Sequence, residues 1–184
     1  MTVRLALLVV LSFFALPASA ADWIVDTRES AISFSGTHLD DPFSGQFQDW
    51  SAYIGFDPNE PEAAKVHVVV KPGSAVTGNQ LYDGTLKSAD WFAVEQYPGA
   101  VFESSGFTAL KPGHYVTEGT LTIKGKSVPL ALKFKLDIKG DTGTMTASHV
   151  LDRVAVGLGA GSDPNGKWVS REITLDIRLE ATER

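Results

Sequence analysis

Apolar and polar residues alternate in a stretch near the middle of the chain. Apolar side chains occupy every second position from Val128 to Ile138, whereas Lys133 and Asp137 lie among the positions between them. Successive side chains of a strand project to opposite faces, so this spacing predicts a β-strand with one apolar and one solvent face. The apolar face can contact a tightly packed core or a cavity, and alternation alone does not decide between them.

Short alternating segments of the same kind recur along most of the chain, separated by Gly, Pro, Asn and Asp. Lys124-Gly125-Lys126 predicts the turn of a hairpin between two of them. The pattern contains no alternation of strands with helices, so we expect an antiparallel all-β sandwich or closed barrel of about eight strands. The expected strands are 22–26, 31–35, 43–47, 50–56, 65–71, 100–104, 107–110, 115–123, 127–138, 142–151 and 172–181.

Residues 77–97 interrupt the alternation and predict a short helical insertion. Leu81 and Leu86 are compatible with short helical turns, and Ser88 or Asp90 is the expected helix cap. Trp91-Phe92 lies in the same insertion, where aromatic side chains would cover one mouth of a barrel. They would act there either as a plug or as the wall of a ligand entrance.

The first twenty residues have the pattern of a secretory signal. Arg4 precedes an apolar run from Leu5 to Leu16, and Ala18-Ser19-Ala20 supplies the small residues of a cleavage site. The run is shorter than the roughly 20 apolar residues that span a bilayer. We therefore predict a signal peptide at 1–20, cleaved after Ala20, and one mature domain at 21–184 that is exported to a bacterial periplasm.

Composition narrows the classes of function. The 184 residues carry a net charge of −6 and contain no cysteine. An acidic exported protein is a poor candidate for nucleic-acid binding. The lack of cysteine excludes disulfides, thiolate metal sites and a cysteine nucleophile.

Candidate catalytic or metal-binding groups are sparse. None of His38, His67, His114 and His149 has a spacing to another histidine that suggests a metal site, and each is expected at the surface or in ordinary hydrogen bonds. No G-x-S-x-G or carboxylate pair stands out, and the glycines at 157–161 fit a barrel rim better than a phosphate loop. We expect no enzyme activity, no metal and no cofactor other than a bound lipid.

Five segments spread over the mature chain match a known pattern in the same order: WIVDTRESAISFSGTHL (23–39), FSGQFQDWSAYIGFDP (43–58), LYDGTLKSADWFAVEQYPGAVFES (81–104), EGTLTIKGKSVPLALKF (118–134) and DRVAVGLG (152–159). In these segments the chain resembles the YceI-like family of periplasmic polyisoprenoid-binding proteins. The resemblance implies an eight-stranded antiparallel lipocalin-like barrel, with a short helical insertion near residues 77–97 and an apolar lumen that takes a long isoprenoid tail.

Three short segments depart from the family's pattern. Tyr82 stands where the family often has Arg before Asp83, and Trp91 replaces the first Phe of its usual Phe-Phe pair. The segment from Arg153 to Gly159 lacks the family's Asp and Phe. These changes affect the expected rim and the identity of the head group more than the apolar lumen.

The resemblance and the alternation together favour a periplasmic carrier that holds a polyprenyl lipid or isoprenoid quinone. An alternative is a redox accessory protein that acts with a membrane cytochrome and its quinone pool. A filled barrel that binds a partner on its outer face is a third hypothesis, and a homodimer stays open. The candidate ligand-binding residues are Ile32, Phe34, Phe47, Val66, Val68, Phe102, Leu121, Leu132, Phe134, Leu175 and Ile177 in the lumen, with Trp91 and Phe92 at the mouth.

Overall fold

A computed structural model describes residues 21–184 of the chain, so the predicted signal peptide at 1–20 lies outside the described residues. The described part is almost entirely β-structure with one α-helix. Its elements are β1 (Asp22–Val25), β2 (Ala31–His38), β3 (Asp41–Phe47), β4 (Trp50–Gly55), the 3₁₀-helix η1 (Pro61–Ala63), β5 (Lys65–Val70), the 3₁₀-helix η2 (Pro72–Ser74), β6 (Ala75–Val76), α1 (Gln80–Lys87), β7 (Ala100–Ser105), β8 (Thr108–Lys111), β9 (His114–Ile123), β10 (Lys126–Lys139), β11 (Thr142–Asp152) and β12 (Glu172–Glu183).

Eight of these strands form a closed antiparallel barrel. Hydrogen-bonded neighbours run β1-β4-β5-β7-β9-β10-β11-β12, and β12 pairs again with β1. β2, β3 and β6 extend the sheet from β12, and β8 adds to β9. The structure thus confirms the barrel over the sandwich, because a ring of pairings leaves no sheet edge between its first and last strands.

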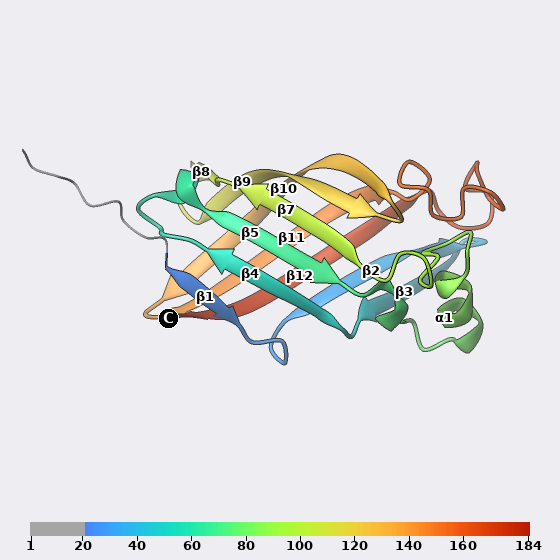
Figure 1. The fold of residues 1–184 in the computed structure, drawn as a ribbon, viewed down its shortest axis with the longest axis horizontal. Helices are drawn as coiled ribbons and strands as arrows, with labels where there is room; N and C mark the ends of the chain where they lie inside the picture. The colour runs from blue at the N-terminus through green and yellow to red at the C-terminus, as the bar shows by residue number, and fades with distance from the viewer. Residues whose placement is uncertain (1–20) are drawn as a thin grey trace, which may run out of the picture.

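Two wall positions of the barrel are each filled by a pair of strands placed end to end. β12 pairs with β1 near Ala181 and with β2 between Thr174 and Arg178. β4 pairs with β1 while β3 pairs with β2, so the same division continues in the next wall position. The barrel is therefore longer than any single one of its N-terminal strands, as Figure 1 shows.

The hairpin predicted at Lys124-Gly125-Lys126 is confirmed. Ile123 pairs with Lys126 across a two-residue turn, and Lys124 and Gly125 have positive φ angles of 49° and 71°. Two positive φ angles are the signature of a type I′ turn, which suits the twist of the flanking strands. Glycine at the second position adopts this conformation without steric strain.

The helical insertion is present, but its predicted cap is wrong. α1 begins after Asn79, whose side chain accepts hydrogen bonds from the N–H groups of Leu81 and Tyr82. Ser88 lies at the other end of the helix, and Asp90 contacts a distant loop instead. Asparagine is among the preferred N-cap residues, so Asn79 fits this position as well as the later Ser88 and Asp90 would.

The barrel has two distinct ends (Figure 1). The helix end carries α1 and the long segment 153–171 that connects β11 to β12. The terminal end carries β1, β8 and the C-terminus. No helix among residues 21–184 combines the length and hydropathy needed to cross a membrane.

Candidate ligand-binding cavity

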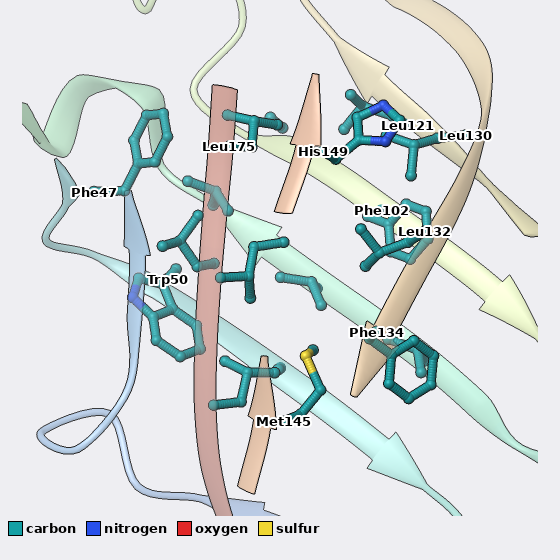
Figure 2. A pocket seen from close by; sticks show the side chains of 18 of the residues that line it. Phe47, Trp50, Phe102, Leu121, Leu130, Leu132, Phe134, Met145, His149 and Leu175 are labelled. Atoms are coloured by element: carbon teal, nitrogen blue, oxygen red, sulfur yellow. The ribbon is translucent and has the colours of Figure 1, made fainter. Parts of the chain in front are cut away.

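The barrel contains an elongated cavity lined almost wholly by carbon atoms (Figure 2). The centre of a water-sized sphere can occupy about 230 Å³ of it. One water molecule needs only about 10–15 Å³ on this measure, so the space is many times larger than a packing defect. The apolar face of the barrel wall therefore looks onto a cavity over part of its length.

Strand alternation builds this lining directly. Val66, Val68 and Val70 of β5 face the cavity, as do Leu132 and Phe134 of β10. The residues between them in each strand point outward, and those of β10 are exposed. The period-2 pattern of the sequence thus places one continuous apolar surface inside the barrel.

Twelve of the thirteen candidate ligand-binding residues come together around the cavity. They are Ile32, Phe34, Phe47, Val66, Val68, Phe92, Phe102, Leu121, Leu132, Phe134, Leu175 and Ile177. Trp91 is not among the lining residues, and the Arg153 guanidinium carbon lies 5.2 Å from the centre of its ring instead. That these residues bind a ligand stays a prediction.

The candidate set omitted several lining residues that the same alternation could have identified. Trp50 and Ile54 share the inward face of β4, and Leu130 belongs to the β10 face. On β11, Met145 and His149 stand two and six positions along from the inward Gly143. Small and polar residues dilute the apolar pattern of β11, which hid its inward face.

His149 is the clearest departure from the histidine predictions. It was expected at the surface or in ordinary hydrogen bonds, but its half-buried imidazole lies on the cavity wall, near Leu121 and Leu130 in Figure 2. Within residues 21–184 it has no hydrogen-bond partner. His67 is exposed as predicted and contacts Glu103, while His38 contacts the Tyr82 hydroxyl at 3.1 Å.

An aromatic cluster fills the terminal end of the barrel. Phe107 packs edge-on against Phe134, with 4.9 Å between ring centroids, and Tyr115 stacks on Phe134 at 5.6 Å. Trp23 and Phe56 complete the cluster, and the Trp23 indole N–H donates to the Phe56 carbonyl at 3.0 Å. This hydrogen bond satisfies the buried indole, and the packed aromatic rings close this end of the barrel.

A second apolar cluster closes the helix end. Phe92 from the insertion packs there with Ile123, Val156 and Leu158, and Val156 is only 1% exposed. Phe92 and Leu158 also line the cavity. The segment 153–171 and the residues after α1 therefore form one wall of the cavity at this end.

A buried ion pair organises the segment 153–171. The Arg153 side chain is 1% exposed and contacts the Asp163 carboxylate at 2.6 Å. Its guanidinium also donates to the backbone carbonyls of Leu158, Asp163, Val169 and Ser170. A guanidinium with its donors occupied in this way can be buried without leaving an unpaired charge.

Asp163 is equally well satisfied. Its carboxylate accepts hydrogen bonds from the backbone N–H groups of Lys167, Trp168 and Val169. Burial alone would raise the pKa of Asp163, but these hydrogen bonds and the Arg153 charge outweigh burial and hold the pKa below its ordinary value. The carboxylate is thus kept ionised and fixes the backbone of three consecutive residues.

Asp90 links the insertion to the segment 153–171. Its carboxylate accepts hydrogen bonds from the backbone N–H groups of Gly161 and Ser162 and from the Ser162 hydroxyl, which lowers the pKa of Asp90. The Lys124 ammonium donates to the carbonyls of Asp90 and Gly157. The glycines at 157–161 therefore form part of the closed rim, as the sequence favoured, and are held by Asp90 and Lys124.

The described residues contain no cluster of three or more His, Asp or Glu side chains that could hold a metal ion. Two other polar side chains on the cavity wall are engaged within the described chain. The Thr117 hydroxyl donates to the Gly106 carbonyl, and Arg153 is engaged by its own loop. The arrangement is suited to enclosing an apolar molecule.

A family model described as the YceI-like domain matches residues 23–181. Among curated proteins, a UPF0312 protein of Pseudomonas savastanoi pv. phaseolicola is 31% identical over 126 residues, which cover 67% of this chain and 66% of that protein. A UPF0312 protein of Shewanella baltica is 35% identical over 119 residues, or 62% of each chain. The chain thus spans about two thirds of the length of these relatives.

Solved structures share the architecture. The crystal structure of Burkholderia cenocepacia BcnA matches with a TM-score of 0.82 and 28% identity over 86% of this chain and 99% of that one. A polyisoprenoid-binding domain from Saccharophagus degradans matches with a TM-score of 0.73 and 15% identity over 90% of this chain and 99% of that one. At 15% identity, the match to the Saccharophagus degradans domain shows a shared fold.

Proposed function

Because this chain belongs to the YceI-like family, we propose that it binds a long isoprenoid lipid, a polyprenyl lipid or an isoprenoid quinone, with the tail inside the barrel. The carrying observation is the apolar cavity between the two packed ends. The fold shared with a polyisoprenoid-binding domain supports the same assignment. The protein would act as a carrier and not as an enzyme.

The driving force is the transfer of hydrocarbon out of water. Each CH₂ group that enters a dry site contributes about 0.8 kcal/mol, from which ordering of the ligand must be subtracted. A flexible prenyl tail that follows the cavity from Phe47 toward Met145 would contact carbon along its whole length. Affinity would then rise with tail length until the cavity is full.

The head group would lie toward the helix end. His149 stands there on the cavity wall without a hydrogen-bond partner among the described residues, and an imidazole can either donate to or accept from an oxygen. At the terminal end, the Trp23 indole N–H on the cavity wall is already paired with the Phe56 carbonyl. An amphiphilic ligand would therefore bind with its tail toward the aromatic cluster.

Export follows from the signal pattern at 1–20, and the carrier would work in the periplasm. The redox accessory role with a membrane cytochrome stays a prediction without a specific observation in its favour. A lipid carrier in this compartment would move a water-insoluble molecule between membranes or to a membrane enzyme. The mature chain would begin at Ala21.

Organic extraction of protein purified from a periplasmic fraction, followed by mass spectrometry, tests the proposal. We expect one prenyl lipid class in stoichiometric amount, and an intact mass of the same sample that lacks Met1–Ala20. Ala52→Trp should fill the cavity from the inward face of β4 and abolish uptake. Ser51→Trp adds the same side chain to the exposed face of the same strand and should leave uptake unchanged.

Two outcomes would overturn the proposed function. One is purified protein that carries no prenyl lipid and, after delipidation, takes up none when it is incubated with a prenyl lipid. The other is equal uptake by Ala52→Trp and Ser51→Trp, with Ala52→Trp still folded by circular dichroism, because an occupied cavity could not then be the binding site.

A further inference from the structure

Large apolar side chains are exposed at the helix end of the barrel. Leu81 on α1 is 73% exposed, Leu39 at the β2–β3 turn is 61% exposed, and Trp168 in the segment 153–171 is 50% exposed. Leucine and tryptophan at such exposure leave much of their apolar surface in water. We call Leu39, Leu81 and Trp168 the apolar tip.

Hydrogen bonds and a β-bridge hold the three supporting elements together. The Leu39 N–H donates to the Trp168 carbonyl at 2.8 Å, and His38 forms a bridge with Val169. The hydroxyl of Tyr82, the residue after Leu81, contacts the His38 imidazole at 3.1 Å. The apolar tip is thus one connected feature made from three segments far apart in sequence.

Trp168 is presented by a rigid support. The Asp163 carboxylate accepts from the Trp168 N–H at 3.2 Å and from the N–H groups on either side of it, and Arg153 holds Asp163 from below. A loop fixed by a buried ion pair loses little freedom when its exposed side chain inserts into a partner. Rigid exposed tryptophan is typical of protein segments at membrane interfaces.

The charged residues around the apolar tip include both acidic and basic side chains. Asp40 and Asp41 follow Leu39, whereas Lys167 precedes Trp168 and Lys87 ends α1. The chain as a whole carries a net charge of −6, so long-range attraction to anionic lipid is not available. Any partner of the tip must therefore be recognised through apolar contact.

We infer that the apolar tip docks the barrel onto the surface of a lipid bilayer, with the helix end of the cavity facing the membrane. This inference rests on the proposed function. An isoprenoid is insoluble in water and resides in a membrane, so a carrier must collect it there. The tip is continuous with the segments that supply Phe92 and Leu158 to the cavity wall, and these segments are the ones that a lipid would pass.

Vesicle flotation tests the docking surface. The full mature protein is mixed with phosphatidylcholine vesicles, and the floated fraction is measured at low and high salt. We expect wild-type protein to float at both salt concentrations and the double variant Leu81→Ser/Trp168→Ser to bind about tenfold or more weakly. The matched control is Ile24→Ser/Leu110→Ser, which removes side chains of 57% and 55% exposure from the terminal end and should float like wild type.

A second measurement separates docking from ligand binding. Geranylgeraniol added from ethanol should bind wild type and the tip variant equally, whereas its uptake from vesicles should be slower for the tip variant. Failure of both proteins to bind geranylgeraniol from ethanol would refute the proposed function and leave the flotation result to stand on its own.

Three results would overturn the docking surface. One is wild-type protein that stays unbound to vesicles, and another is equal flotation of the tip and control variants. In the third, sedimentation would reveal a concentration-dependent dimer that the tip variant loses, without vesicle binding, which would assign the tip to contact with a second copy of the chain.

Discussion

At the scale of single residues, Arg153 is a fully buried charged side chain that contacts several parts of the helix end. It joins the cavity wall, the Trp91 ring and the loop that presents Trp168. A buried guanidinium is tolerated only because Asp163 and four backbone carbonyls accept from it. The sequence showed Arg153 as part of a family segment but gave no sign of its partner, because Asp163 lies ten residues away in an irregular segment without periodicity.

Replacement of Arg153 tests this role. Arg153→Met should lower the free energy of unfolding by about 3–5 kcal/mol, because it leaves the Asp163 carboxylate buried without its cation. The control is Arg171→Met, which breaks the exposed pair with Asp152 and should cost about 0–1 kcal/mol. Urea denaturation measures both, and equal losses for the two variants would contradict the assigned role of Arg153.

At the scale of elements, two neighbouring inward side chains of one strand have different surroundings. Along β10, Phe134 belongs to the aromatic cluster of the terminal end, while Leu132 faces the open part of the cavity. Phe102 on β7 also lines the cavity but belongs to neither packed cluster. Truncation of Phe134 and of Phe102 to alanine should therefore lower the free energy of unfolding by different amounts.

Phe134→Ala should lower the free energy of unfolding by about 3–5 kcal/mol, because its ring is packed on several sides. Phe102→Ala should cost less, since one side of its ring already faces empty space and loses few contacts. In the lipid-loaded protein the difference should narrow, because the ligand would then contact Phe102. Thermal unfolding of delipidated and loaded samples measures both, and a larger loss for Phe102→Ala would contradict the division into packed ends and open middle.

Sequence reasoning succeeded where a local rule applied. Alternation placed the β10 face correctly, and Lys124-Gly125 predicted its hairpin because both the spacing and the turn chemistry are local. It failed where the answer depends on distant segments. His149 was missed because its face of β11 also contains Gly143 and Ala147. The contact of Trp91 with Arg153 was not foreseen, because the two residues are 62 positions apart in the sequence.

At the scale of the whole molecule, the two ends of the barrel are held by different forces. The terminal end is closed by apolar and aromatic packing, which does not change with pH. The helix end depends on the carboxylates of Asp90, Asp152 and Asp163, and the pKa of each is lower than its ordinary value of 3.8. The ends should therefore respond differently to acid.

The direction of the pH effect on stability follows from the linkage between proton binding and folding. A carboxyl whose pKa is lower in the folded than in the unfolded protein stabilises the fold above its unfolded pKa, and the contribution disappears as the pH falls through the folded pKa. For Asp90 the Ser162 hydroxyl is the main cause of the lower pKa, and for Asp163 the backbone N–H groups of 167–169 outweigh the effect of burial. Both contributions are therefore complete at neutral pH and fade below about pH 4.

We expect acid to loosen the helix end before the terminal end. Hydrogen exchange followed by mass spectrometry should show protection lost in residues 153–171 below about pH 4, while β1 and the start of β9 near Tyr115 remain protected. Asp163→Asn should weaken protection of the same segment at neutral pH and reduce its further loss in acid, because the titrating group is gone. Simultaneous loss of protection at both ends, or an unchanged acid response in Asp163→Asn, would contradict this account. If the helix end opens alone, lipid release should accelerate over the same pH range, because Phe92 and Leu158 would leave the cavity wall together with the loop.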